Sequence, residues 1–160
     1  MDVEIEVTIN AKAEQIFKAL TTGPAVWWSS HYLERENAID LVLEPKVGGR
    51  FYEQWSRTSQ DLSGALLGTV VAIDPPKLLR MSGNFGITDR AVAGLVSIEL
   101  TPNAGSTQIR FSHRVVGNLD DQIELKYASC WHDLLGRLKF FMEEGKAEGI
   151  RRDPSLDFID

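Results

Sequence analysis

The chain has 160 residues, and its 17 Lys and Arg against 23 Asp and Glu give a formal charge of −6 with the histidines neutral. This length suits one domain that buries roughly 70% of its unfolded surface. The acidic balance argues against a nucleic-acid partner, because neutralising phosphates needs a basic surface, and the longest Lys/Arg run is Arg151-Arg152.

Cysteine is rare in the chain, and long apolar runs are absent from it. The single Cys130 excludes an internal disulfide, and the three histidines are too scattered to predict a metal site. We therefore expect no metal, no cofactor and a reducing, cytoplasmic setting. No stretch approaches the ~20 apolar residues that cross a bilayer, so we expect no membrane insertion.

The first 28 residues predict one strand and two helices. Apolar and polar residues alternate over residues 3–9, the period of a strand with one buried face. Asn10 is expected to cap a helix with apolar residues at helical spacing: Ala13, Ile16, Phe17 and Leu20. Pro24 begins a second, short helix that carries Trp27 and Trp28.

The middle of the chain predicts strands joined by turns. Period-two or β-rich runs are separated by Gly, Pro, Asn and Asp, and they cover 39–44, 50–56, 64–74, 78–82, 91–101 and 107–115. Antiparallel hairpins in chain order are the simplest arrangement. The glycine-bearing segment 83–90, which holds Phe85 and Ile87, is predicted to be a loop.

A long helix is predicted to close the domain. It begins near Asp120-Asp121 and ends before Gly145, and its apolar residues form one stripe: Ile123, Tyr127, Cys130, Trp131, Leu134, Leu138, Phe141 and Met142. About 24 residues make a rod of about 36 Å, enough to cross a sheet. We expect a single domain over residues 1–150 and a polar tail over 151–160.

A strand, two short helices, about six further strands and a long amphipathic helix define an α+β order. This order resembles the helix-grip domains of the START-like SRPBCC superfamily, and more narrowly the branch named after the activator of the ninety-kilodalton heat-shock protein ATPase. The resemblance covers residues 3 to about 145 and rests on several short motifs: Val7-Thr8-Ile9-Asn10-Ala11, Trp27-Trp28, Gly48-Gly49-Arg50-Phe51, Gly68-Thr69-Val70, Ile73-Asp74-Pro75-Pro76-Lys77-Leu78, and Trp131 with Leu134, Leu138 and Phe141.

The resemblance implies a curved antiparallel sheet of six or seven strands wrapped around the last helix, with a pocket between them. Two positions depart from the family. Cys130 stands where a glycine often precedes the helix tryptophan, and the segment 83–90 does not align. The identity of a ligand is therefore not carried over.

Glu53 is the first candidate for polar chemistry. Phe51, Glu53 and Trp55 share one face of the predicted strand. On the concave side of the sheet, burial would raise the carboxyl pKa and make the group a hydrogen-bond donor or a general acid. Under a loop, or after a bulge, it would have no such role.

His113 is the second candidate. It shares an inward face with Ile109 and Phe111, while the other face carries Arg110 and Arg114. An inward histidine anchors a ligand or transfers a proton, or else it is a core residue with an internal hydrogen bond. If Glu53 and His113 meet in one pocket, they form an acid/base pair.

Three functions follow as hypotheses. The first is binding of a small hydrophobic or aromatic ligand of ten or so heavy atoms by nine residues: Trp28, Phe51, Glu53, Trp55, Phe85, Phe111, His113, Tyr127 and Trp131. The second is an enzyme of the polyketide-cyclase or dehydratase type, which uses Glu53 and His113. The third is a module that contacts a chaperone, for which the acidic face of residues 2–6 is a candidate surface. The sequence leaves dimer formation open.

Overall fold

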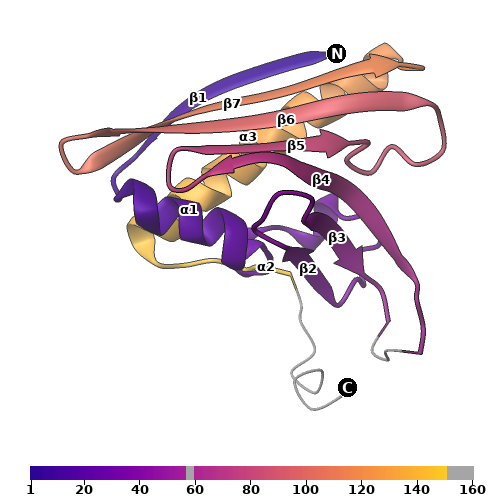
Figure 1. The fold of residues 1–160 in the computed structure, drawn as a ribbon, viewed down its shortest axis with the longest axis horizontal. Coiled ribbons are helices and arrows are strands. Elements are labelled where there is room, and N and C mark those ends of the chain that lie inside the picture. Colours follow the sequence, from indigo (N-terminus) through magenta and orange to yellow (C-terminus); the bar gives the residue numbers. More distant parts are fainter. Residues whose placement is uncertain (57–59, 151–160) are drawn as a thin grey trace.

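The computed structural model describes residues 1–56 and 60–150, so the expected tail over 151–160 lies outside the described residues (Figure 1). Its elements are β1 (Asp2–Ile9), α1 (Ala13–Thr22), α2 (Pro24–Trp27), the short 3-10 helix η1 (Ser30–Tyr32), β2 (Asp40–Leu43), β3 (Arg50–Gln54), β4 (Gly64–Asp74), β5 (Leu78–Gly83), β6 (Val92–Asn103), β7 (Ser106–Gly117) and α3 (Asp121–Glu144).

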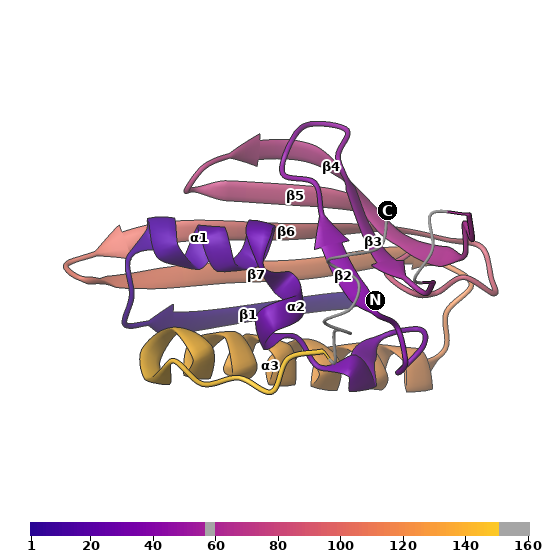
Figure 2. The same cartoon turned by 90° about the horizontal axis from the view of Figure 1, so that it is seen from below.

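The strands form one seven-stranded antiparallel sheet in the order β1-β7-β6-β5-β4-β3-β2. The sheet curves, and α3 runs across it while packing against β1 (Figure 1). Figure 2 shows α1 and α2 on the same side of the sheet as α3, with α2 beside β2. The helix-grip architecture expected from the order of elements is confirmed.

Alternation along the strands separates a buried face from a solvated one. On β7, Ile109, Phe111 and His113 are buried, whereas Arg110 and Arg114 point outward. The stripe of α3 covers the buried face with Trp131, Leu134, Leu135 and Leu138. Apolar burial on both layers therefore drives the packing of helix against sheet.

The start of α1 differs from the prediction. The residue that caps α1 is Lys12, without a side-chain hydrogen bond, and not Asn10. Asn10 lies in the turn that leaves β1, where its backbone N–H donates to Glu143 on α3. This long-range contact keeps Asn10 outside the helix. By contrast, Asp120 caps α3 as expected, since its carboxylate accepts a hydrogen bond from the Ile123 N–H.

Within the described ranges, no helix is both long and apolar enough to cross a membrane.

Candidate functional site

The largest aromatic cluster of the core surrounds a cavity of about 80 Å³ between the sheet and the N-terminal half of α3. Six of the nine predicted ligand-binding residues line it: Trp28, Phe51, Glu53, Phe85, Tyr127 and Trp131. This volume is well below the about 300–1,000 Å³ typical of ligand pockets. In this conformation the cavity does not hold the ligand of ten or so heavy atoms expected from the sequence.

A second cavity of about 30 Å³ lies deeper in the core. It shares Trp28, Phe51 and Trp131 with the first cavity, and its remaining walls, which include Phe111, are apolar. The three shared aromatic side chains form the partition between the two spaces. The predicted residues Trp55 and His113 are not among the side chains that line either cavity.

Glu53 is buried on β3, which is the concave-side alternative for its face of the strand. Its carboxylate accepts hydrogen bonds from the backbone N–H of Glu34 at 2.7 Å, the backbone N–H of Arg35 at 3.3 Å and Trp55 Nε1 at 3.1 Å. The Arg35 guanidinium lies 4.1 Å from the centre of the Trp55 ring. These donors satisfy a buried carboxylate, so Glu53 fixes the segment after η1 against β3.

His113 is fully buried on β7. Its Nδ1 accepts a hydrogen bond from Trp131 Nε1 at 2.9 Å, so the neutral ring carries its proton on Nε2. Burial first, and then repulsion from the Met1 ammonium group, lower the pKa of His113 to about 4. The ring is therefore neutral at pH 7. Nε2 has no hydrogen-bond partner among the described residues.

Glu53 and His113 do not form the acid/base pair considered from the sequence. Each is hydrogen-bonded to other groups, and only Glu53 lines a cavity. The rings of Phe85, Tyr127 and Trp131 pack around His113, with centroids 5.1, 5.6 and 5.7 Å from it. These aromatic rings therefore surround the histidine, and they do not enclose a carboxylate–imidazole pair.

Trp28 adds a second buried donor. It follows α2, and its ring lies 5.8 Å from Phe51 and 5.8 Å from Trp131, edge to face in both cases. Its Nε1 is buried and, like His113 Nε2, is without a partner in the described part of the chain. Buried N–H groups are normally hydrogen-bonded, so two such donors within one aromatic cluster are unusual.

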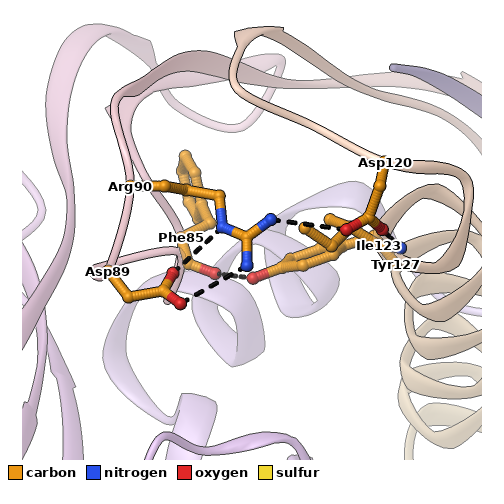
Figure 3. Close-up of polar contacts among 6 residues, drawn as sticks. All are labelled: Phe85, Asp89, Arg90, Asp120, Ile123 and Tyr127. Carbon is orange, nitrogen blue, oxygen red and sulfur yellow. Dashed lines mark hydrogen bonds and ion pairs between the residues drawn. The ribbon is translucent and has the colours of Figure 1, made fainter.

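The loop between β5 and β6 closes the cavity. Tyr127 on α3 donates from its hydroxyl to the backbone carbonyl of Phe85 at 2.6 Å (Figure 3). Arg90 lies between Asp89, at 3.2 Å, and Asp120 at the start of α3, at 3.5 Å (Figure 3). These contacts attach the loop to the first turns of α3.

Several residues that line the cavity were not predicted as ligand-binding residues from the sequence: His31, Tyr32, Glu34, Lys126, and also Gly86 and Cys130, which the family resemblance placed only at the mouth of the cavity. Burial and the nearby Glu53 charge raise the pKa of Glu34. Burial raises the pKa of the Cys130 thiol to about 12, so the thiol stays protonated. Most of these residues lie on η1, its following segment or α3, and only the tertiary fold brings them to β3. The local sequence signal for Gly86 was its place next to Phe85 in the glycine-bearing segment 83–90, which was predicted to be a loop.

The acidic face of β1 is paired within the chain. Arg114 contacts Asp2 and Glu4 across the strand pair at 3.2 and 2.7 Å, and Arg110 contacts Glu6 at 3.5 Å. All of these groups are exposed, and exposed pairs contribute little to stability. The arrangement is that of a solvated sheet face. The described residues also contain no group of three or more His, Cys, Asp or Glu placed to hold a metal ion.

A curved antiparallel sheet closed by a long C-terminal helix, with an aromatic cavity between them, defines a START-like helix-grip protein. The family model for Activator of Hsp90 ATPase homolog 1-like protein matches residues 10–143, and the chain belongs to this family. No curated protein matches the chain significantly.

Solved structures share the fold at low identity. The Aha1 dimer from Colwellia psychrerythraea has a TM-score of 0.65 and 22% identity, over 92% of this chain and 99% of that one. CalU16 from Micromonospora echinospora has a TM-score of 0.63 and 17% identity, over 88% of this chain and 75% of that one. A Mesorhizobium loti protein has a TM-score of 0.65 and 22% identity, over 91% and 99% of the two chains.

Proposed function

We propose that this protein binds a small hydrophobic or aromatic ligand in the space between the sheet and the N-terminal half of α3. The observation that carries the proposal is an aromatic cavity beside two buried N–H donors without partners, on Trp28 and His113. Ligand sites combine apolar walls with a few polar groups that fix orientation. The family as a whole supports ligand binding as the general role of such a domain.

The hydrogen bonds of the two candidate catalytic residues favour binding over acid–base catalysis. The Glu53 carboxylate already accepts hydrogen bonds from Glu34, Arg35 and Trp55. His113 has a low pKa and donates from a fixed tautomer, which suits an anchor for an acceptor atom better than a general base at neutral pH. Nothing at the cavity specifically supports the cyclase or dehydratase alternative.

A module that contacts a chaperone is expected to expose an apolar patch in addition to the acidic face of residues 2–6. Among the described residues, the four most exposed large apolar side chains lie on separate elements: Leu62 before β4, Leu125 on α3, Val116 on β7 and Val47 in the β2–β3 turn. The Colwellia relative is described as a dimer. Sedimentation velocity tests whether this chain also forms one, a question separate from ligand binding.

Native mass spectrometry of freshly purified protein, followed by denaturing extraction, tests the proposal. We expect a hydrophobic compound to travel with the wild-type protein. Trp131→Leu should lose most of it, because Trp131 lines both cavities. Phe140→Leu is the matched control, since Phe140 lies on the same helix but is exposed. A wild-type protein that is empty, and that also binds no member of a panel of aromatic and acyl compounds, contradicts the proposal.

A further inference from the structure

The larger cavity is about half of the about 150 Å³ that accommodates benzene in an engineered protein core. Several aromatic rings line this cavity, and one of them belongs to Phe85. Phe85 comes from the β5–β6 loop and not from a strand or helix, and its side chain is only 7% exposed. Its ring contacts His113, Trp131 and Phe51 with centroid distances of 5.1, 6.4 and 6.5 Å. A loop residue thus fills the centre of the aromatic cluster.

The backbone of Phe85 is in an unusual conformation. Its φ is +48°, in the left-handed region that bulky residues rarely adopt, and Gly86 follows with φ +94°. Such conformations persist only where surrounding contacts hold them. Here the Phe85 N–H donates to the Leu67 carbonyl at 2.9 Å, and the Phe85 carbonyl accepts from Tyr127. The loop is therefore held so that it directs this ring inward.

The sheet is shaped to receive the ring. A Cβ at Gly68 on β4 would lie 2.9 Å from Phe85 Cζ, so a larger residue there would meet the ring. A Cβ at Gly86 would lie 2.9 Å from the Glu34 carboxylate and 3.3 Å from the Tyr127 hydroxyl. Two glycines thus leave room for Phe85, one under its ring and one where the loop passes the cavity rim.

We propose that the Phe85 ring occupies the ligand position, and that the ligand is an aromatic compound with a hydrogen-bond acceptor oxygen that replaces this ring beside His113. The inference rests on the proposed function and specifies its ligand class. His113 Nε2 is a buried donor without a partner in the described residues, and Phe85 has the nearest ring centroid of the three aromatic side chains packed around the His113 ring. An aromatic face is at most a weak acceptor, so a carbonyl or carboxylate oxygen would satisfy this N–H better.

Replacing one aromatic ring with another conserves the packing of the cluster. The incoming ring takes the contacts with Trp131 and Phe51, while its oxygen provides the acceptor that Phe85 lacks. Release of Phe85 requires the Tyr127 hydrogen bond to break and the loop to move at Gly86. The wild-type protein therefore binds with an affinity reduced by the fraction of molecules in which the ring has left the cluster.

Two probes of matched shape test the inference by calorimetry: acetophenone, which has a carbonyl oxygen, and ethylbenzene, which does not. In Phe85→Ala the space is open in every molecule, so we expect acetophenone to bind at least about tenfold more tightly than to the wild-type protein. Acetophenone should also exceed ethylbenzene by about three- to tenfold in this variant, the contribution of one hydrogen bond.

Ring-nitrogen NMR of protein labelled at histidine supplies a direct readout. Acetophenone should shift the resonances of His113, and ethylbenzene should not shift Nε2 in the same way. His132 is exposed and lines neither cavity, so it serves as an internal control. If Phe85→Ala does not fold, Tyr127→Phe keeps the ring and removes only the hydroxyl that holds the loop, and it should bind acetophenone a few times more tightly than the wild-type protein.

The outcomes separate this inference from the proposed function. A folded Phe85→Ala, or Tyr127→Phe in its place, that gains no affinity for acetophenone overturns the ligand position assigned to Phe85. If the wild-type protein still carries an extracted hydrophobic compound in that case, the proposed function stands. The ligand then lies elsewhere in the space between the sheet and the N-terminal half of α3. Equal gains for the two probes, without a shift at His113, overturn the acceptor-oxygen part of the inference.

Discussion

Under the C-terminal half of α3 the core is mainly aliphatic and borders only the cavity of about 30 Å³, whereas under the N-terminal half it is aromatic and holds the cavity of about 80 Å³. In the first region, Ile9, Ile16 and Leu138 are 0% exposed, and Lys139 and Glu143 attach the helix to the end of β1 and the turn after it. In the second region, His113 is equally buried and yet retains an unpartnered donor. One half of the core therefore serves stability alone, while the other leaves buried donors unpaired, as expected of a binding site under the proposed function.

The largest effect is expected in the aliphatic half. Leu138→Ala truncates a fully buried side chain and leaves an apolar cavity. This should lower the free energy of unfolding by about 2–5 kcal/mol. Urea titration monitored by circular dichroism measures the loss, and the compound retained by the wild-type protein should still be retained. Phe140→Ala on the exposed side of the same helix is the control, with an expected change within about 0.5 kcal/mol. Loss of the retained compound in Leu138→Ala would abolish the distinction between the two halves.

The aromatic half should respond to pH through His113. Its pKa is about 4 in the folded protein, below the usual 6.5, so the unfolded chain binds the extra proton between these values. The contribution of neutral His113 to the free energy of unfolding is fully present above about pH 6.5. It falls by about 3 kcal/mol as the pH drops to about 4. Urea titrations from pH 7.5 to 4 should show a flatter curve for His113→Gln, which does not titrate. Parallel curves for the two proteins would contradict a buried neutral histidine.

Glu53 tests whether the aromatic half also contains purely structural polar groups. Glu53→Gln replaces one acceptor oxygen by an N–H₂ group that faces N–H donors, and should lower the free energy of unfolding by about 1–3 kcal/mol. Amide hydrogen exchange at Glu34 and Arg35 should accelerate as well. Glu44→Gln is the matched control, because Glu44 pairs with Arg50 at the surface of the β2–β3 hairpin and should cost less. An equal cost at the two positions would assign Glu53 no special structural role.

The fold was predictable from local patterns because each layer has its own period. Alternation along β1 and β7 and the three-to-four spacing on α3 identified the elements, and their order indicated a helix-grip architecture. Inward placement of His113 also followed from parity, whereas parity grouped Glu53 with Phe51 and Trp55 but left open which side of the sheet this face meets. The start of α1 did not follow, because the contact between Asn10 and Glu143 joins residues 133 positions apart.

The chemistry of the site was less predictable for the same reason. Parity shows that a side chain points inward but not which donors or acceptors it meets. The donors on Glu34 and Arg35 that satisfy Glu53 lie 19 and 18 residues from it, and Trp131, which orients His113, lies 18 residues away on another element. The size of the cavity depends on Phe85, whose loop has no periodic pattern. Most of the aromatic residues that line the cavity were therefore predictable from the sequence, and the volume of the cavity was not.

The smallest effect concerns the hydrogen bond that joins the loop to α3. Tyr127→Phe removes the donor to the Phe85 carbonyl and should cost about 1 kcal/mol of unfolding free energy. Its specific consequence is local: the amides of Gly86 and Ile87, which bond to Asn84 within the loop, should exchange faster while those of β6 and β7 do not change.

Tyr32→Phe distinguishes this local release from general loosening of the cavity rim. It removes a hydroxyl that donates to Asp133 at 2.6 Å, also on α3, without touching the loop. Exchange at Gly86 and Ile87 should then stay as in the wild-type protein. If the two variants accelerate exchange in the loop equally, the effect is a general loosening of the cavity rim, and the Tyr127 hydroxyl has no specific role in holding Phe85 in place. If only Tyr127→Phe does so, one hydrogen bond controls how often the aromatic half of the core opens.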